Sequence, residues 1–261
     1  MRSCVSLLAK SSSSSRWLAR QSRDPFVRQR SSNPASSSTS NQPSYRSRSS
    51  FKLVSLAKSH PVLLNKETKS VVDLGAAPGG WTQVASKILG VGKKEGHKPD
   101  KTRVWAIDIL PMDSLPNVHI LQGNFLSPSV QAALQSHTGT PESGAGVDTV
   151  LSDMMAPMTG VRTRDVSMSL ELCEAATAFA RRVLRRKKAE EEMEVVRGKK
   201  IWPGGNLVMK FFAHPDLDEF KKVELDPWFG KVVIGKPKES RSESSEAYFV
   251  CLGFKGEPTT K

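Results

Sequence analysis

The fold is decided by residues 71–81, VVDLGAAPGGW, which run from an apolar strand through a glycine-rich turn into a helix. Gly75, Gly79 and Gly80 let the backbone turn tightly and approach a ligand without an obstructing Cβ atom. The helix that follows presents free N–H groups at its first turn. Open α/β sheets bind their ligands at the carboxyl ends of the strands. The segment therefore predicts a ligand site at the end of the first strand of an α/β domain.

Two acids border this site in the sequence. Asp73, near the end of the first strand, is placed to accept a hydrogen bond from an amino group such as that of a methionine moiety. Asp108 ends the second strand, where an acid can bind both hydroxyls of an adenosine ribose. Together they favour an adenosine-containing cofactor. The glycine-rich turn alone also fits a dinucleotide or a purely structural turn, but it lacks the G-x-G-x-x-G spacing, which disfavours a nicotinamide oxidoreductase.

Outward from this segment, short apolar runs alternate with helical patterns, which is typical of a mainly parallel sheet with helices on both faces. Strands are expected at 71–74, 103–107, 118–122, 147–152, 206–211, 230–234 and 247–252. Helices are expected near 81–89, 128–136, 166–188 and 215–224. Two insertions are expected to lie on the surface. One is a loop rich in Gly and Lys over 90–101. The other is a charged stretch over 185–200, which is interpreted as a solvated helix end.

The first fifty residues differ from the rest of the chain. They contain eighteen Ser, nine basic residues and one acid, a composition that buries too little apolar surface to fold. Residues 1–44 are therefore interpreted as a disordered leader, and their Arg- and Ser-rich, acid-poor pattern indicates mitochondrial or plastid targeting. A basic arm that touches RNA directly is the alternative. The catalytic domain is expected over 45–254, with a flexible tail over 255–261.

The formal charge of +13 favours a polyanionic partner, because Lys and Arg that neutralise phosphates release counterions. Residues 1–50 carry +8 of it, which leaves +5 for a mildly basic body. The three cysteines are far apart and form no CxxC pair, so the sequence indicates neither disulfides nor a metal site. No apolar run approaches the roughly 20 residues that cross a bilayer, and no membrane association is expected.

Charged residues occur where the strands would ordinarily carry apolar ones. Lys210 lies inside the apolar strand 206–211, where a charge is costly unless it is paired. One interpretation is a structural ion pair with Asp153 or Glu246. The other is that Lys210 takes a proton from a hydroxyl while Asp153 holds its amine in place. Burial and a second cation, such as Lys52, would favour the neutral amine that this role requires.

Seven motifs closely resemble the FtsJ/RrmJ-type ribosomal RNA 2′-O-methyltransferases. In chain order they are RSRSSFKL (46–53), VVDLGAAPGGW (71–81), AIDILPMD (106–113), LQGNF (121–125), LSDMMAP (151–157), PGGNLVMKFF (203–212) and SEAYFV (245–250). The resemblance covers essentially all of 45–254. It implies a Rossmann-like class I fold that depends on S-adenosylmethionine, with a seven-stranded, mostly parallel sheet whose last strand is antiparallel.

The resemblance also implies the site. The family's catalytic K-D-K-E tetrad matches Lys52, Asp153, Lys210 and Glu246. With the glycine-rich turn included, the predicted contacts to S-adenosyl-L-methionine are Asp73, Gly75, Pro78, Gly79, Gly80, Trp81, Asp108, Asn124 and Asp153. The family usually has Asp where this chain has Asn124, at a position that faces the adenine. Asn both donates and accepts hydrogen bonds, so this contact can survive in altered form.

The leader makes the mitochondrial members of the family, which modify large-subunit ribosomal RNA, the best match. A monomer that methylates a uridine 2′-oxygen within a large-subunit assembly intermediate is therefore expected. A transfer RNA 2′-O-methyltransferase, and an assembly factor whose methylation is secondary, remain alternatives. Several basic residues are expected near the entrance of the active site, where they would contact RNA phosphates. They are Arg46, Arg48, Lys58, Arg162, Arg164, Lys236, Lys238 and Arg241.

Overall fold

The computed structural model describes residues 45–91, 103–139, 146–188, 191–196, 199–240 and 244–258 of the 261-residue chain. The leader predicted over 1–44 and all but the first residues of the loop predicted over 90–101 lie outside these ranges. The last three residues of the predicted tail and Arg241 lie outside them as well. The predictions for these segments remain predictions.

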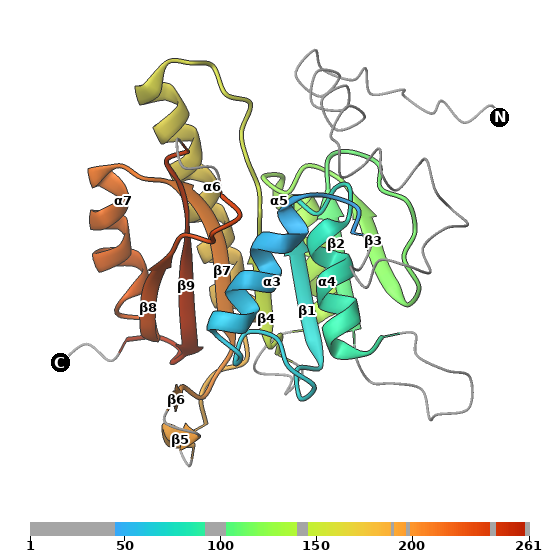
Figure 1. Cartoon of the computed structure of the whole chain (residues 1–261), viewed down its shortest axis with the longest axis vertical. Helices are drawn as coiled ribbons and strands as arrows, with labels where there is room; N and C mark the ends of the chain where they lie inside the picture. Colours follow the sequence, from blue (N-terminus) through green and yellow to red (C-terminus); the bar gives the residue numbers. More distant parts are fainter. Residues whose placement is uncertain are drawn as a thin grey trace.

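A seven-stranded sheet forms the centre of the molecule (Figure 1), in the order β3-β2-β1-β4-β7-β9-β8. Its strands are β1 (Ser70–Leu74), β2 (Arg103–Asp108), β3 (Val118–Gln122), β4 (Thr149–Ser152), β7 (Asn206–Phe212), β8 (Phe229–Gly235) and β9 (Glu246–Phe254). Neighbouring strands are parallel except where β9 pairs with β7 and with β8. This arrangement confirms the predicted mostly parallel sheet with an antiparallel last strand.

Helices cover both faces of the sheet (Figure 1). The helices α3 (Ser49–Ser59) and α4 (Gly80–Leu89) pack on one face. The helices on the other face are α5 (Pro128–Thr138), α6 (Arg162–Val183) and α7 (Pro215–Phe220), and the short π-helix η2 (Lys221–Leu225) continues α7. Apolar side chains fill the space on each side, so two separate cores hold the sheet between them. No helix of the described residues has the length and apolar character needed to cross a membrane.

The helix α3 is absent from the elements predicted above. Its buried residues include Leu53, Leu56 and Ala57, and this three-to-four spacing is that of an amphipathic helix. It begins within four residues of the serine-rich leader, whose composition obscures the pattern. The omission matters for function because α3 carries Lys52.

The prediction of a solvated helix end over 185–200 is wrong. The helix α6 ends at Val183, and the strands β5 (Glu194–Val196) and β6 (Lys199–Ile201) form an antiparallel hairpin within the insertion. The small strands lie below the main sheet in Figure 1, on the side of its amino ends.

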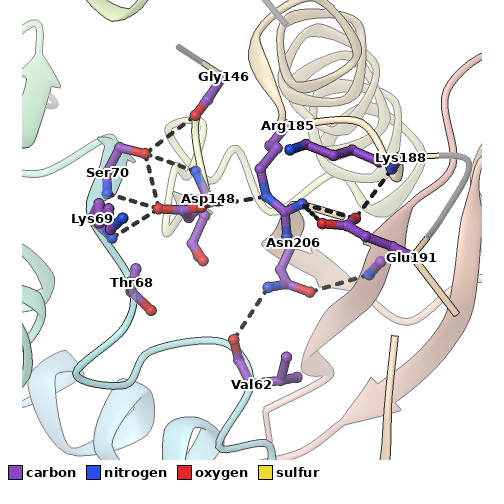
Figure 2. A network of polar contacts seen from close by, with 12 residues as sticks. Val62, Thr68, Lys69, Ser70, Gly146, Asp148, Arg185, Lys188, Glu191 and Asn206 are labelled. Carbon is purple, nitrogen blue, oxygen red and sulfur yellow. Dashed lines mark hydrogen bonds and ion pairs between the residues drawn. The ribbon is translucent and has the colours of Figure 1, made fainter. Parts of the chain in front are cut away.

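A polar network explains why the chain leaves the helix there (Figure 2). One carboxylate oxygen of Asp148 accepts hydrogen bonds from the backbone N–H groups of Lys69 and Ser70, at 2.8 and 3.0 Å. The guanidinium of Arg185 lies 3.7 Å from the other oxygen and donates to both carboxylate oxygens of Glu191 at 3.0 Å. Because Arg185 is held at the start of β4 and turned toward Glu191, the charged segment folds back instead of extending α6.

Candidate active site

Strand register brings Lys210 and Asp153 together. Ser152 of β4 lies opposite Met209 of β7, so the next residue of each strand falls at the same edge of the sheet. The Lys210 ammonium nitrogen lies 3.0 Å from Asp153 Oδ1 and 2.7 Å from the Asp153 backbone oxygen. Only 7% of the Lys210 side chain is exposed. Of the two ion-pair partners considered for Lys210, the structure selects Asp153.

The other two members of the tetrad form a second ion pair. Lys52 reaches across from α3, and its ammonium nitrogen lies 2.6 Å from Glu246 Oε1. Tyr248 joins the two pairs, because its hydroxyl oxygen lies 3.1 Å from Asp153 Oδ1 and 3.2 Å from Glu246 Oε1 and can donate its single proton to either carboxylate. The four predicted residues therefore form one hydrogen-bonded cluster around a tyrosine.

Tyr248 is a member of the cluster that is not among the residues predicted from the sequence. Its position offers a signal, because it lies two residues after Glu246 on β9 and so points to the same face of the sheet. It also lies opposite Lys210 in the β7–β9 register. Burial, then the charges of Asp153 and Glu246, raise the pKa of Tyr248 well above its usual value. The phenol therefore stays protonated and acts as a donor.

Glu246 stays ionised within this cluster. Burial alone would raise the pKa of its carboxyl group. The hydrogen bond and positive charge of Lys52, together with the charge of Lys210, outweigh that effect and hold the pKa below its usual value. Glu246 therefore carries its negative charge at neutral pH beside Lys52.

Replacing Tyr248 by Phe is expected to slow the methyl transfer that the resemblance implies about tenfold or more, the scale of a lost hydrogen bond to a charged group. The ring still fills its place beside Trp81, with ring centroids 5.6 Å apart, so folding and cofactor affinity should change little. Single-turnover rates with saturating RNA measure the effect. Tyr45→Phe, the same chemical change outside the cluster, is the matched control. Equal rates for both variants would show that the Tyr248 hydroxyl does not align the tetrad.

Asp73 lies fully buried at the end of β1. Its Oδ2 atom accepts a hydrogen bond from the Thr82 hydroxyl at 2.6 Å, whereas its buried Oδ1 atom has no hydrogen-bond partner among the described residues. Buried acceptors are nearly always satisfied, so an unpaired one at the predicted ligand site suits an ammonium donor from a bound molecule. Burial raises the pKa of Asp73 to about 7, against the lowering effect of the Thr82 hydrogen bond. The amino group of a methionine moiety is a donor that would satisfy this acceptor.

This pKa predicts how stability depends on pH. The folded protein keeps the Asp73 proton up to about pH 7, whereas an unperturbed aspartate loses it near 3.8. Protonated Asp73 therefore makes a stabilising contribution to the free energy of unfolding that is fully present below pH 3.8 and is lost as the pH rises to about 7. We expect urea unfolding to show Asp73→Asn gaining stability relative to the wild-type protein across that range, with a constant difference above it. A difference that does not vary with pH would contradict the raised pKa.

Asp108 holds two parts of the site together. Its Oδ2 atom accepts from the backbone N–H of Ala77 in the glycine-rich turn at 2.9 Å, and its Oδ1 atom accepts from the N–H of Leu110 at 2.8 Å. Burial raises the pKa of Asp108 against these backbone hydrogen bonds. Each oxygen retains a second acceptor position. The carboxylate can therefore accept further hydrogen bonds, and its predicted contact with ribose hydroxyls stays a prediction.

The glycine-rich turn has the backbone that its composition predicts. Gly75 and Gly79 adopt left-handed conformations, with φ of +74° and +101°, on either side of a cis peptide bond before Pro78. A Cβ atom on Gly75 would lie 2.6 Å from the side chain of Met154, the residue after Asp153. The turn and the loop after β4 therefore approach so closely that only glycine fits.

Gly80 and Trp81 serve the packing of α3 on α4. The hydroxyl groups of Ser47 and Ser50 occupy the space that a side chain at Gly80 would need. The Trp81 indole is 2% exposed, and its N–H donates to the backbone oxygen of Ser49 at 2.9 Å. Their predicted cofactor contacts can therefore involve only backbone atoms at the start of α4.

Asn124 lies at the edge of the site. Its side-chain oxygen accepts from the N–H of Leu126 at 3.0 Å, which fixes the turn after β3. The amide nitrogen is the group that it can offer to an adenine. The predicted contact stays a prediction.

Arg46 has a different task from the phosphate binding predicted for it. Its guanidinium donates to the backbone oxygens of Asp113 at 2.7 Å, Ser114 at 2.8 Å and Pro78 at 3.3 Å. These bonds clamp the glycine-rich turn to the loop after β2. Proximity to the entrance alone does not distinguish a phosphate contact from such a carbonyl clamp.

Lys58 does not lie at the entrance of the site. It lies in the last turn of α3, and the residues that follow share a hollow with Ser70 and Asp148 at the amino ends of the strands. Exposed basic residues that remain candidates for phosphate contacts are Arg48, Arg162, Arg164, Lys236 and Lys238. Arg241 lies outside the described residues. Within the described ranges, no group of three or more His, Cys, Asp or Glu side chains is arranged to hold a metal ion.

Comparison with known proteins identifies the family. The family of FtsJ-like methyltransferases matches residues 45–254. "Ribosomal RNA large subunit methyltransferase E" from Pseudomonas paraeruginosa is 36% identical over 250 residues, which are 96% of this chain and 100% of that protein. The protein of the same name from Marinobacter nauticus is 37% identical over 248 residues, 95% of this chain and 99% of that one.

A solved structure supports the same family assignment. The crystal structure of a ribosomal RNA methyltransferase from Plasmodium falciparum superposes with a TM-score of 0.62 at 25% identity, covering 82% of this chain and 100% of that one. The unpaired acceptor of Asp73 and the placement of Asp108 suit S-adenosylmethionine, which is the methyl donor of the family. The chain therefore belongs to the FtsJ-like methyltransferase family and is an S-adenosylmethionine-dependent methyltransferase.

Proposed function

We propose that the chain methylates the 2′-oxygen of a ribose in large-subunit ribosomal RNA. The observation that carries this proposal is the pair of hydrogen bonds from Lys210 to Asp153, at 2.7 and 3.0 Å. A neutral lysine amine has two N–H bonds and one lone pair. With both N–H bonds directed at Asp153, the lone pair is left to accept a proton from a substrate hydroxyl.

The reaction follows from this geometry. S-adenosylmethionine, when bound, supplies a methyl group activated by its sulfonium. Lys210 takes the proton of the 2′-hydroxyl as the ribose oxygen bonds to the methyl carbon and the carbon–sulfur bond breaks. Glu246 holds Lys52 in the same cluster, which places a second amine beside the reacting groups. Asp73 and Asp108 hold the two ends of the methyl donor, so much of the rate comes from alignment.

The relatives support ribosomal RNA as the substrate. The proteins from Pseudomonas and Marinobacter are both named as methyltransferases of large-subunit ribosomal RNA. The alignments cover 100% and 99% of their lengths, so the likeness includes the parts of those proteins that contact RNA.

The test is methyl transfer from labelled S-adenosylmethionine to large-subunit ribosomal RNA, large-subunit precursor particles and transfer RNA, followed by mapping of 2′-O-methyl nucleotides. We expect one methylated ribose in the ribosomal RNA, with Lys210→Ala as the inactive control. Methylation of transfer RNA in place of ribosomal RNA would overturn the substrate. Equal particle binding and maturation with the inactive variant would favour an assembly factor whose methylation is secondary.

We further propose that residues 1–44 direct the protein to mitochondria, where its substrate is a uridine of the mitochondrial large-subunit RNA in an assembly intermediate. Support comes from the Arg- and Ser-rich, acid-poor composition of this segment.

Deletion of residues 1–44 tests this proposal. The truncated protein is expected to keep its melting temperature and its activity in vitro, because the segment lacks the apolar content to join the core. Import into isolated mitochondria should be lost. A truncated protein that folds normally but no longer binds RNA would show instead that the segment is an RNA-binding arm.

A further inference from the structure

The loop between β4 and α6 holds apolar side chains in solvent. It rises above the carboxyl edge of the sheet, where the tetrad lies (Figure 1). Met155, Met158 and Val161 are 45%, 56% and 57% exposed. We refer to these three residues as the apolar ledge. Exposed apolar side chains gathered beside a catalytic cluster indicate a binding surface more often than isolated ones do.

The ledge is held in place by Asp165 of α6. The Asp165 carboxylate accepts hydrogen bonds from the N–H and the hydroxyl of Thr159, both at 2.7 Å, and from the N–H of Gly160 at 3.0 Å. Gly160 has a φ of +83°, which allows the turn. The backbone of the loop is thus fixed before any ligand arrives, which lowers the entropic cost of binding there.

The ledge adjoins the catalytic lysine. A hollow at the end of β7 is lined by Lys210 and Phe212 of that strand, by Ser169 of α6, and by Met155 and Met158 of the loop. A nucleotide whose ribose reaches Lys210 therefore brings its neighbour in the RNA chain to the ledge. Two exposed arginines, Arg162 and Arg164, directly follow the ledge in sequence and add positive charge beside it.

We propose that the apolar ledge binds the face of an unpaired base adjacent to the methylated nucleotide, while Arg162 and Arg164 contact the flanking phosphates. This inference rests on the proposed RNA substrate. Polarisable methionine side chains pack well against flat aromatic surfaces, and a base offers such a face only when it is unstacked. The neighbouring arginines and the position beside Lys210 favour RNA over a ribosomal protein as the occupant. The ledge would thus select a single-stranded or opened segment without reading its sequence.

The first test is the double variant Met155→Ser/Met158→Ser. We expect it to weaken RNA binding at least about fivefold, the lower end of what one stacked base contributes. Cofactor affinity should stay near the wild-type value. Met155→Leu/Met158→Leu, which keeps the apolar surface, should restore most of the binding. Val223→Ser is the matched control, because Val223 is 58% exposed on η2 and does not line the hollow.

The second test removes the base instead of the protein side chains. Two RNAs are compared, one without the base just before the target nucleotide and one without the base just after it. One of them should bind the wild-type protein more weakly, by the same factor by which the serine double variant weakens binding of intact RNA. The serine double variant should show no further loss of affinity for that RNA, because the two changes remove the same contact. Additive losses, or normal RNA binding by the serine variant, would overturn the ledge proposal. So would a defect seen only with ribosomal particles and not with RNA alone, which would identify a protein as the occupant. A wild-type protein that methylates no RNA at all would contradict the proposed function instead.

Discussion

Asp108→Ala is expected to weaken S-adenosylmethionine binding by about 1–3 kcal/mol, or about 5- to 150-fold. The carboxylate is placed to accept the ribose hydroxyls, and it also fixes Ala77 in the glycine-rich turn and Leu110 in the loop after β2. Its loss therefore removes both a contact and the support of two loops. Isothermal titration calorimetry on the folded protein measures the effect directly.

Two further variants sharpen this test. Asp108→Asn keeps one acceptor oxygen and the shape of the side chain, so it should lose less affinity than the alanine variant. Asp113→Ala is the control, because Asp113 is exposed in the same loop and contributes only its backbone oxygen to the Arg46 clamp. Unchanged affinity in Asp108→Ala would remove Asp108 from the cofactor site.

The sheet could be predicted from the sequence because each strand is an apolar run next to a glycine-rich turn or a polar residue. The strand predicted over 206–211 is observed as Asn206–Phe212, and that predicted over 118–122 is observed as Val118–Gln122. The limits of α6 could not be predicted in this way. Its charged continuation is compatible with a helix, and the chain is turned aside by long-range contacts, among them those of Arg185 with Asp148 and Glu191.

The members of the site could be predicted, but their pairing could not. Motifs identify Lys52 and Lys210 without showing which acid each one meets. The pairing depends on the register of β4, β7 and β9, which no local pattern specifies. Tyr248 is missed for the same reason, because its hydroxyl becomes important only when two carboxylates converge on it.

Lys210→Ala is expected to lose methyl transfer by at least about 100-fold, the lower end of what positioned proton transfer contributes, while cofactor binding is retained. The alanine variant also leaves Asp153 without its ion-pair partner, so it does not separate a catalytic lysine from a structural one. Lys210→Arg separates them. Arginine keeps the positive charge and can still pair with Asp153, but a guanidinium does not give up its proton near neutral pH.

A structural ion pair should therefore tolerate arginine at least in part, whereas a general base should not. Single-turnover methyl transfer with saturating RNA, measured from about pH 6 to 9, distinguishes the two roles. Lys221→Arg is the matched control, since Lys221 forms an ion pair with Asp226 at 2.8 Å outside the active site. The control should react at the wild-type rate and Lys210→Arg should be as slow as Lys210→Ala. A folded Lys210→Arg protein with near-normal rates would show that Lys210 is a structural cation and that another group removes the proton.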